Sequence, residues 1–424
     1  MALAENIQAE FKSVEHADAV GQVRQQAFDA FSKLGIPSVR HEEWKYTNVK
    51  TKLPETLSVL NSSAPTVPSY NSVTEFNAVK LVFVNGVFTP SLSQYSEQQG
   101  ITITSLKQAF TTHNQLVEKH YGKLVYFNEE HFAALNTAFA TDGAFIHISK
   151  NTTAELPVLI VHLFTNGAEN FNQTRTLVIA EQGSEIHLIE DFRNLASSAY
   201  YNHVSEIYVG ANASVNITKL QTETANTTGI HTLEADLARD AKFTCTDISF
   251  DGALIRNNVN ARLKGENAEA HLYGLYYGVG NSVLDNHILI DHIVPNCQSN
   301  QLYKGVLDDE ATGVFNGKIF VKQDAQKTNA FQSSKAILLS NEASINSKPQ
   351  LEIFADDVKC SHGAAIGQLG KNEVFYLRAR GITEHDAKAM LTYAFANDII
   401  EKVGNPQIKE HLSTVLRNRL GLAE

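Results

Sequence analysis

Cysteine is scarce in this chain of 424 residues, which has only Cys245, Cys297 and Cys360. Three unclustered cysteines argue against a disulfide framework and are typical of a protein in a reducing compartment. The N-terminal segment carries acidic residues and lacks an apolar core of secretory length, and the sequence has no run of about 18 apolar residues. We therefore expect a cytoplasmic protein that does not span a membrane.

Positive charge is also in deficit, with 35 Lys and Arg residues against 46 Asp and Glu residues and a formal net charge of -11. A broad nucleic-acid interface needs a basic face, and an anionic membrane surface repels an acidic protein. The composition therefore argues against nucleic acid and membrane lipid as partners.

Catalytic motifs are missing from the sequence as well. It contains no HExxH pair and no GxSxG elbow. The segment from Gly313 to Lys318 has three residues between its glycines and is followed by Ile319. A phosphate-binding loop needs four residues there and then Ser or Thr. The sequence therefore gives no support to nucleophilic hydrolysis, and we predict that the chain does not hydrolyse ATP.

An internal repeat dominates the middle of the chain. The segments EQGSEIHL, GANASVNI, ARDAKFTC and GENAEAHL align with separations of 29, 28 and 27 residues on Ser184, Ala213, Ala241 and Ala268. A near-constant period with β-type alternation favours a solenoid, and a parallel β-helix is the best interpretation. A two-sheet sandwich stays open on this pattern alone.

The repeat aligns alternate side chains into two columns. They consist of Ile186, Val215, Phe243 and Ala270, and of Leu188, Ile217, Cys245 and Leu272. Cys245 is thus predicted to fill the core. Related units at Ala311, Ala325 and Ala343 have irregular spacing, so we expect the period to break after about Tyr277. Cys297 matches no compact zinc motif, and a packing or turn role is favoured for it.

The chain is predicted to have three parts: a helical or mixed N-terminal region at 1–140, the β-helix core at 141–372 and a helical C-terminal region at 373–424. Two amphipathic helices are expected in the last part. Their apolar residues must pack on the solenoid, on each other or on a partner. We predict partner binding through residues of both helices, namely Met390, Leu391, Ala394, Phe395, Leu412 and Leu416.

The segment KPQLEIFADDVKCSHGA places Cys360 and His362 two residues apart. On a strand their side chains would share one face, where thiolate and imidazole could bind one metal ion. Two donors cannot close a tetrahedral shell, so a partner or a distant segment would have to complete it. Spacing alone favours the alternative, a buried thiol beside a hydrogen-bonded imidazole. Asp356 and Asp357 are expected to form a solvated turn.

Several long segments resemble the SufD family of the SUF iron–sulfur cluster assembly system. They are LEIFADDVKCSHGA, FYLRARGI, RHEEWKYT, PNCQSNQLYKGVL and VFNGKIFVKQDAQKTNAFQSSKAILLS. The resemblance implies a mainly β fold, with a right-handed parallel β-helix between N-terminal and C-terminal helical regions. It also implies a non-catalytic scaffold that pairs with SufB and docks the ATPase SufC.

In that family the residues that match Cys360 and His362 lie at the interface with SufB. The resemblance therefore makes His362 the cluster ligand and Cys360 a protective or transient ligand. It implies that the nascent iron–sulfur cluster forms in the complex and that the isolated chain holds no stable cofactor. A self-complementary sheet edge would also allow a homodimer when SufB is absent.

Two further interpretations stay open. Trp44, the only tryptophan, lies in RHEEWKYT and would serve either as a docking site or as an anchor between surface and core. A carbohydrate-active β-helix enzyme with calcium is the alternative function, and it would use acidic residues among Asp285, Asp291, Asp308, Asp309, Asp356 and Asp357.

Overall fold

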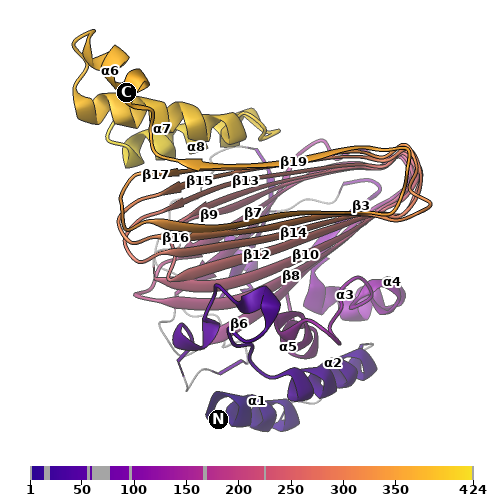
Figure 1. Ribbon diagram of the computed structural model, residues 1–424. Helices are drawn as coiled ribbons and strands as arrows, with labels where there is room; N and C mark the ends of the chain where they lie inside the picture. Colours follow the sequence, from indigo (N-terminus) through magenta and orange to yellow (C-terminus); the bar gives the residue numbers. More distant parts are fainter. Residues whose placement is uncertain are drawn as a thin grey trace.

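The computed structural model describes residues 2–13, 20–54, 58–59, 77–94, 98–165, 170–223 and 226–422. The described chain is mainly β, with a ten-stranded and a nine-stranded sheet that face each other (Figure 1). Helices lie before β1, between β3 and β4, and after β19. None of the helices in the described ranges has the length and apolar character to cross a membrane.

The helices of the described ranges are α1 (Ala2–Ser13), α2 (Gly21–Leu34), α3 (Leu106–Thr112), α4 (Asn114–His120), α5 (His131–Phe139), α6 (Lys371–Arg378), α7 (Glu384–Ile400) and α8 (Pro406–Arg419). The strands are β1 (Val79–Val84), β2 (Val87–Phe88), β3 (Ile101–Ser105), β4 (Ala144–Ile148), β5 (Val158–Phe164), β6 (Phe171–Ala180), β7 (Glu185–Asn194), β8 (Ala199–Val209), β9 (Ser214–Glu223), β10 (Thr227–Leu237), β11 (Lys242–Phe250), β12 (Leu254–Leu263), β13 (Glu269–Gly278), β14 (Val283–His292), β15 (Gln298–Leu307), β16 (Thr312–Val321), β17 (Asn329–Leu338), β18 (Ser344–Ile353) and β19 (Lys359–Gly367).

Successive strands alternate between the two sheets. From β5 onward the odd-numbered strands pair in parallel in one sheet, and from β4 onward the even-numbered strands do so in the other. Each coil of the chain therefore gives one strand to each sheet. This arrangement confirms the predicted parallel β-helix and rules out a sandwich of antiparallel sheets.

The structure confirms the two predicted columns of side chains. Ile186, Val215, Phe243 and Ala270 are register neighbours on β7, β9, β11 and β13, and so are Leu188, Ile217, Cys245 and Leu272. All eight are buried between the sheets, and Cys245 is 1% exposed, so its predicted core role is confirmed. Apolar burial along these columns stabilises every coil against the next.

The predicted break in the period after Tyr277 is wrong. The odd-numbered sheet continues without interruption through β15 and β17 to β19. Cys297, fully buried just before β15, takes the place that Ala268 holds before β13. Its packing role is thus confirmed. Ala311 and Ala343 precede β16 and β18 and belong to the other sheet, so their spacing looked irregular.

Asparagine and aspartate explain the polar turn in each repeat unit. Asn212, Asp240, Asn267 and Asn296 precede consecutive odd-numbered strands and have φ values of 57°, 57°, 59° and 63°. This left-handed conformation is costly for most residues, and Asn and Asp tolerate it better because their side chains bond locally. The sequence repeat therefore reflects both the turns between strands, where Asn or Asp recurs, and the buried positions of the core.

The N-terminal helices cover the outer face of the even-numbered sheet. Residues of α1, α2 and α5 form one apolar cluster with Phe171, Ile230 and Leu254 of that sheet. Trp44 is 3% exposed in the same cluster, and its ring lies 5.3 Å from that of Phe132 and 3.8 Å from the Arg256 guanidinium. The structure therefore favours the anchoring role of Trp44 over an exposed docking site.

The C-terminal helices cover the outer face of the odd-numbered sheet (Figure 1). Leu412 and Leu416 of α8 are fully buried there against the solenoid, in a cluster that includes Leu220 and Leu275. Their predicted role as partner-binding residues is therefore corrected, because this chain already covers them. Met390 on α7 is 42% exposed and remains available to a partner.

We expect Leu412→Ala to lower the free energy of unfolding of the isolated chain by about 2–5 kcal/mol, because it leaves a cavity beneath α8. The matched Met390→Ala variant removes an exposed side chain and should change the free energy of unfolding by less than about 0.5 kcal/mol. Chemical denaturation of both variants measures the difference. Equal stabilities would show that α8 does not depend on this packing.

Candidate functional site at the open end of the solenoid

The last coil of the solenoid, formed by β18 and β19, has no further coil on top of it. These two strands are the outermost strands of their sheets (Figure 1). Lys359 N–H donates to Thr328 O, so in the parallel ladder every second N–H group after it faces β17. The N–H groups between them, including that of Ala364, face away from β17. Exposed edges of this kind are templates for strand pairing.

Cys360 and His362 are the terminal members of the two interior columns. Cys360 is in register with the buried Ala330, and His362 with the buried Gln332. Both side chains are therefore on the strand face that points between the sheets, as their spacing predicts. The next residue in the column of His362 is Gln301, whose Oε1 accepts a 2.6 Å hydrogen bond from Gln332 Nε2.

The two candidate ligands differ in burial. Cys360 is half-buried against the apolar cluster of Ile319, Val321 and Ala330, whereas His362 is exposed. Burial raises the pKa of the Cys360 thiol, opposed by a hydrogen bond with the Ala330 backbone. Because metal binding needs the thiolate, ligation by Cys360 should weaken as the pH falls.

The site is incomplete within the described chain. His362 makes no side-chain hydrogen bond to any described residue, so its ring nitrogens can accept a ligand. No third His, Cys, Asp or Glu side chain among the described residues joins Cys360 and His362 at metal-binding distances. Asp356 and Asp357 are exposed in the bend before β19, as expected of a solvated turn.

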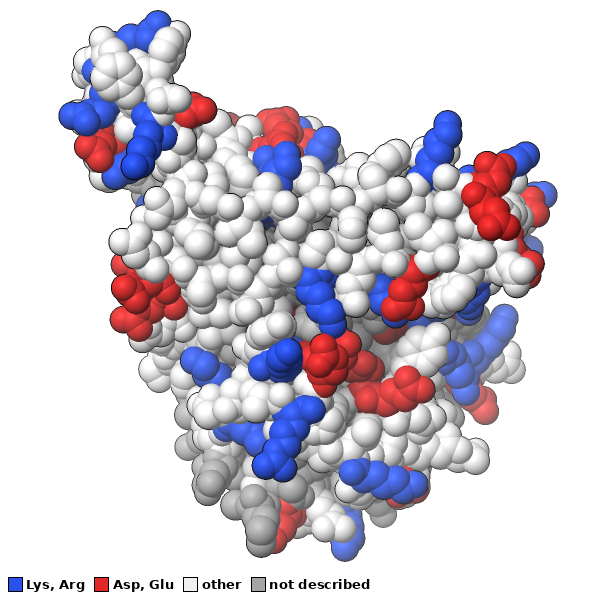
Figure 2. Space-filling model, viewed as in Figure 1, with Lys and Arg blue, Asp and Glu red and all other residues white. Residues whose placement is uncertain are grey.

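A second exposed feature lies beside this coil, on the projection formed by α6. Phe375 and Tyr376 of α6 are 72% and 57% exposed. Figure 2 shows both basic and acidic side chains on this projection. Lys371 and Arg378 belong to α6, and Arg380 follows it. Exposed aromatic residues near arginine are typical of binding hot spots.

Comparison with known proteins assigns most of the chain to one family. Residues 5–160 match the SufBD protein N-terminal region, and residues 163–395 match the SufBD core domain of the SUF system for FeS cluster assembly. The chain belongs to the SufBD family. It is 33% identical over 90% of its length to an iron–sulfur cluster assembly SufBD family protein of Synechocystis, of which the alignment covers 86%.

Two SufBD relatives carry the name SufD. The chain is 31% identical to the iron–sulfur cluster assembly protein SufD of Escherichia coli, with 93% of this chain and 92% of the relative aligned. Identity to SufD of Bacillus subtilis is 28%, over 94% of this chain and 93% of the relative. The resemblance found in the sequence motifs is therefore confirmed, and the chain is a SUF-system protein of iron–sulfur cluster assembly.

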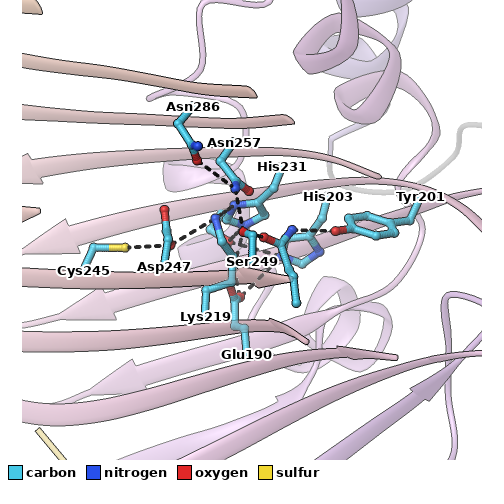
Figure 3. Close-up of polar contacts among 12 residues, drawn as sticks. Glu190, Tyr201, His203, Lys219, His231, Cys245, Asp247, Ser249, Asn257 and Asn286 are labelled. Atoms are coloured by element: carbon cyan, nitrogen blue, oxygen red, sulfur yellow. Dashed lines mark hydrogen bonds and ion pairs between the residues drawn. The ribbon is translucent and has the colours of Figure 1, made fainter. Parts of the chain in front are cut away.

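Sequence reasoning missed a polar layer inside the solenoid of this SufBD protein. Glu190, Lys219 and Asp247 are register neighbours in the odd-numbered sheet, and His203 and His231 are neighbours in the facing sheet (Figure 3). All five are buried. Extending the repeat alignment by two positions beyond Leu188 and Ile217 would have shown the charged residues Glu190 and Lys219 in an interior column.

Burial and charge set the protonation of this layer. Burial, followed by the neighbouring Lys219 ammonium, lowers the pKa of His231 to about 3, so its ring is neutral. Burial opposes ionisation of Glu190, but His203 and His231 outweigh it and hold the pKa of that carboxyl well below its ordinary value. Lys219 Nζ lies 3.1 Å from Asp247 Oδ1 and 2.8 Å from His231 Nδ1.

The aspartates of the alternative calcium enzyme do not gather into a site. Asp285 is buried and binds Arg256 and Thr47, and Asp291 pairs with Lys322. The one metal-like group among the described residues, Glu190 with His203 and His231, includes none of the six aspartates. No observation in the described chain therefore favours the carbohydrate-active interpretation.

Proposed function

We propose that this SufBD family chain is a non-catalytic, cytoplasmic scaffold that pairs with SufB and docks the ATPase SufC. In this proposal an iron–sulfur cluster is assembled at the interface with SufB. The observation that carries it is the open terminal coil, where His362 and Cys360 present two donor atoms that no third described residue joins. A partner that covers this coil would supply the missing ligands.

Strand pairing supports the interface with SufB. The free edges of β18 and β19 offer a row of backbone donors and acceptors, and β-strand addition by a partner would satisfy them. Such pairing would place donors of the partner close to His362. Self-pairing of the same edges would give a homodimer of the isolated chain.

The nascent cluster is the product that the scaffold builds and releases, and we propose that the isolated chain keeps none. Neutral imidazole and thiolate are suitable ligands for iron in sulfide clusters. With two donors from this chain, the cluster would depend on the partner for its remaining ligands. Loss of the partner should therefore release the cluster.

Docking of SufC is assigned to the exposed residues of α6 and α7. Of the residues predicted from sequence, Met390 and Ala394 are exposed, and Leu391 and Phe395 are half-buried. Phe375 and Tyr376 extend this apolar surface onto α6. Leu412 and Leu416 support the surface from beneath, because they hold α8 on the solenoid.

The edge proposal is tested with Ala364→Pro in the full chain co-expressed with SufB and SufC. Proline removes an N–H group that faces the free side of β19, so the fold should tolerate it while pairing with a partner loses a hydrogen bond. We expect recovery of SufB with the tagged chain to fall roughly tenfold. Ala364→Ser keeps the N–H group and is the matched control.

Size-exclusion chromatography of the isolated variants shows whether each chain remains folded and whether it dimerises. Full recovery of SufB with a folded Ala364→Pro chain would contradict pairing through β19. Failure of the wild-type chain to bring down either SufB or SufC would overturn the scaffold proposal as a whole.

A further inference from the structure

The buried layer inside the solenoid contains four donor groups arranged around one point. Glu190 comes from β7, His203 from β8 and His231 from β10 (Figure 3). Ser205 also belongs to β8. Glu190 Oε1 lies 3.4 Å from His203 Nε2, and Glu190 Oε2 lies 3.5 Å from His231 Nε2. Ser205 Oγ is 3.1 Å from His203 Nε2, 3.2 Å from His231 Nε2 and 3.3 Å from Glu190 Oε1.

These distances fit the edges of a tetrahedral metal site. With metal–ligand bonds of about 2.0–2.1 Å, the donors of a tetrahedral zinc site lie roughly 3.4 Å apart. Hydrogen bonds to an ionised carboxylate are usually near 2.7–2.9 Å, shorter than the contacts of Glu190. The two oxygens of Glu190 are thus spaced from the imidazoles as ligands of one ion would be, while the Ser205 Oγ contacts also fall within hydrogen-bonding range.

The second nitrogen of each imidazole is held by a further residue. His203 Nδ1 lies 2.7 Å from Thr174 Oγ1, which can accept its proton and leave Nε2 with a free lone pair. His231 Nδ1 lies 2.8 Å from Lys219 Nζ. An outer acceptor such as Thr174 Oγ1 orients a histidine ligand of a metal site.

The charged groups of the layer also leave a carboxylate for a cation. Glu190 and Asp247 are buried, and the one lysine of the layer, Lys219, lies 3.1 Å from Asp247 Oδ1. Glu190 is left to the two imidazoles and Ser205. Zinc bound through Nε2 of His231 would take the place of any proton on that nitrogen.

We propose that Glu190, His203 and His231, with Ser205 at the fourth corner, form a structural zinc site inside the solenoid. The site is closed and fully buried, which is typical of structural rather than catalytic zinc. Glu190 lies six strands from β19 in the odd-numbered sheet, or roughly 29 Å at the usual strand spacing. It is therefore separate from the cluster site at the terminal coil.

The test uses the full chain with Cys360→Ser and His362→Ala in every protein, so that metal bound at the terminal coil does not contribute. Each protein is unfolded with chelator and refolded with or without zinc, because the buried site should load only during folding. Zinc content is measured by mass spectrometry after gel filtration. We expect one zinc ion per chain and a zinc-dependent rise in melting temperature.

Glu190→Gln and His203→Gln should each lower the zinc content at least roughly tenfold. His162→Phe is the matched control, because His162 is buried, its ring lies 4.8 Å from that of His203, and neither of its nitrogens has a partner among the described residues. This variant should keep its zinc.

Refolding with cobalt provides a second measurement, since a tetrahedral site gives visible absorption bands. A parent chain that refolds with zinc yet contains none and gains no stability would overturn the proposal. A folded Glu190→Gln chain with the same zinc content as the parent would also overturn it. Neither outcome bears on the proposed cluster site at the terminal coil, because Cys360 and His362 are replaced in all these proteins.

Discussion

Replacing His362 by alanine is expected to lower the iron–sulfur cluster content of the co-purified complex by at least roughly tenfold, the usual effect of weakening a metal site. His362 is the exposed imidazole of the last coil, and the side chain it stacks on, Gln332, is already paired with Gln301. Its removal deletes a donor without opening the core, so the fold should persist. Iron, acid-labile sulfide and Mössbauer spectra of the complex measure the result.

Ser361→Ala is the matched control for His362→Ala. Ser361 lies on the same strand but is in register with Phe331, which is 46% exposed, so its side chain points out of the solenoid. This variant should assemble cluster normally. A normal cluster yield with His362→Ala, in a complex that still contains SufB, would remove His362 from the site.

Replacing Phe375 and Tyr376 by alanine together is expected to weaken binding of SufC at least roughly thirtyfold, because truncation of an interface hot spot costs about 2 kcal/mol or more. These rings are exposed on α6, next to the basic side chains of Arg378 and Arg380. The fold should keep its stability, since neither ring is buried. Calorimetric titration of the isolated chain with SufC gives the affinity.

The control for the α6 variant is Tyr126→Ala, which truncates another exposed aromatic residue, 53% exposed and distant in sequence from α6. It should bind SufC as the parent does. Unchanged affinity after loss of both α6 rings would show that SufC binds elsewhere, and α6 would then have no docking role.

Much of the fold could be predicted from the sequence because each coil has the same two structural requirements. One is a turn that Asn or Asp tolerates, and the other is an alternating pair of buried positions. The repeat was lost after Tyr277 because Cys297, Thr328 and Val358 replace the alanine that marks the earlier coils. β15, β17 and β19 nevertheless pair in register, so the solenoid can pack these larger side chains at the position of the alanine. A sequence search for alanine misses these coils.

The candidate site was predictable in part. Spacing placed Cys360 and His362 on one face, but only the stack of strands shows that this face is the interior and that it is open at the end. The apolar periodicity of α8 could not reveal what covers it, because a stripe such as Leu412 and Leu416 suits a partner and the parent chain equally well. The polar layer around Glu190 depends on two facing sheets, which no one-dimensional pattern records.

The column that ends in His362 changes in chemistry along the solenoid. Aliphatic residues such as Leu188 and Ile217 fill it in the middle, and the amides Gln301 and Gln332 replace them near β19. The local free energy of unfolding should therefore fall toward the open end, where hydrogen bonds between amide side chains replace the burial of apolar surface. Amide hydrogen exchange would then run as a gradient along the axis, fastest in the last two coils. A subunit docking there would meet a surface soft enough to adapt and would make it rigid as it binds.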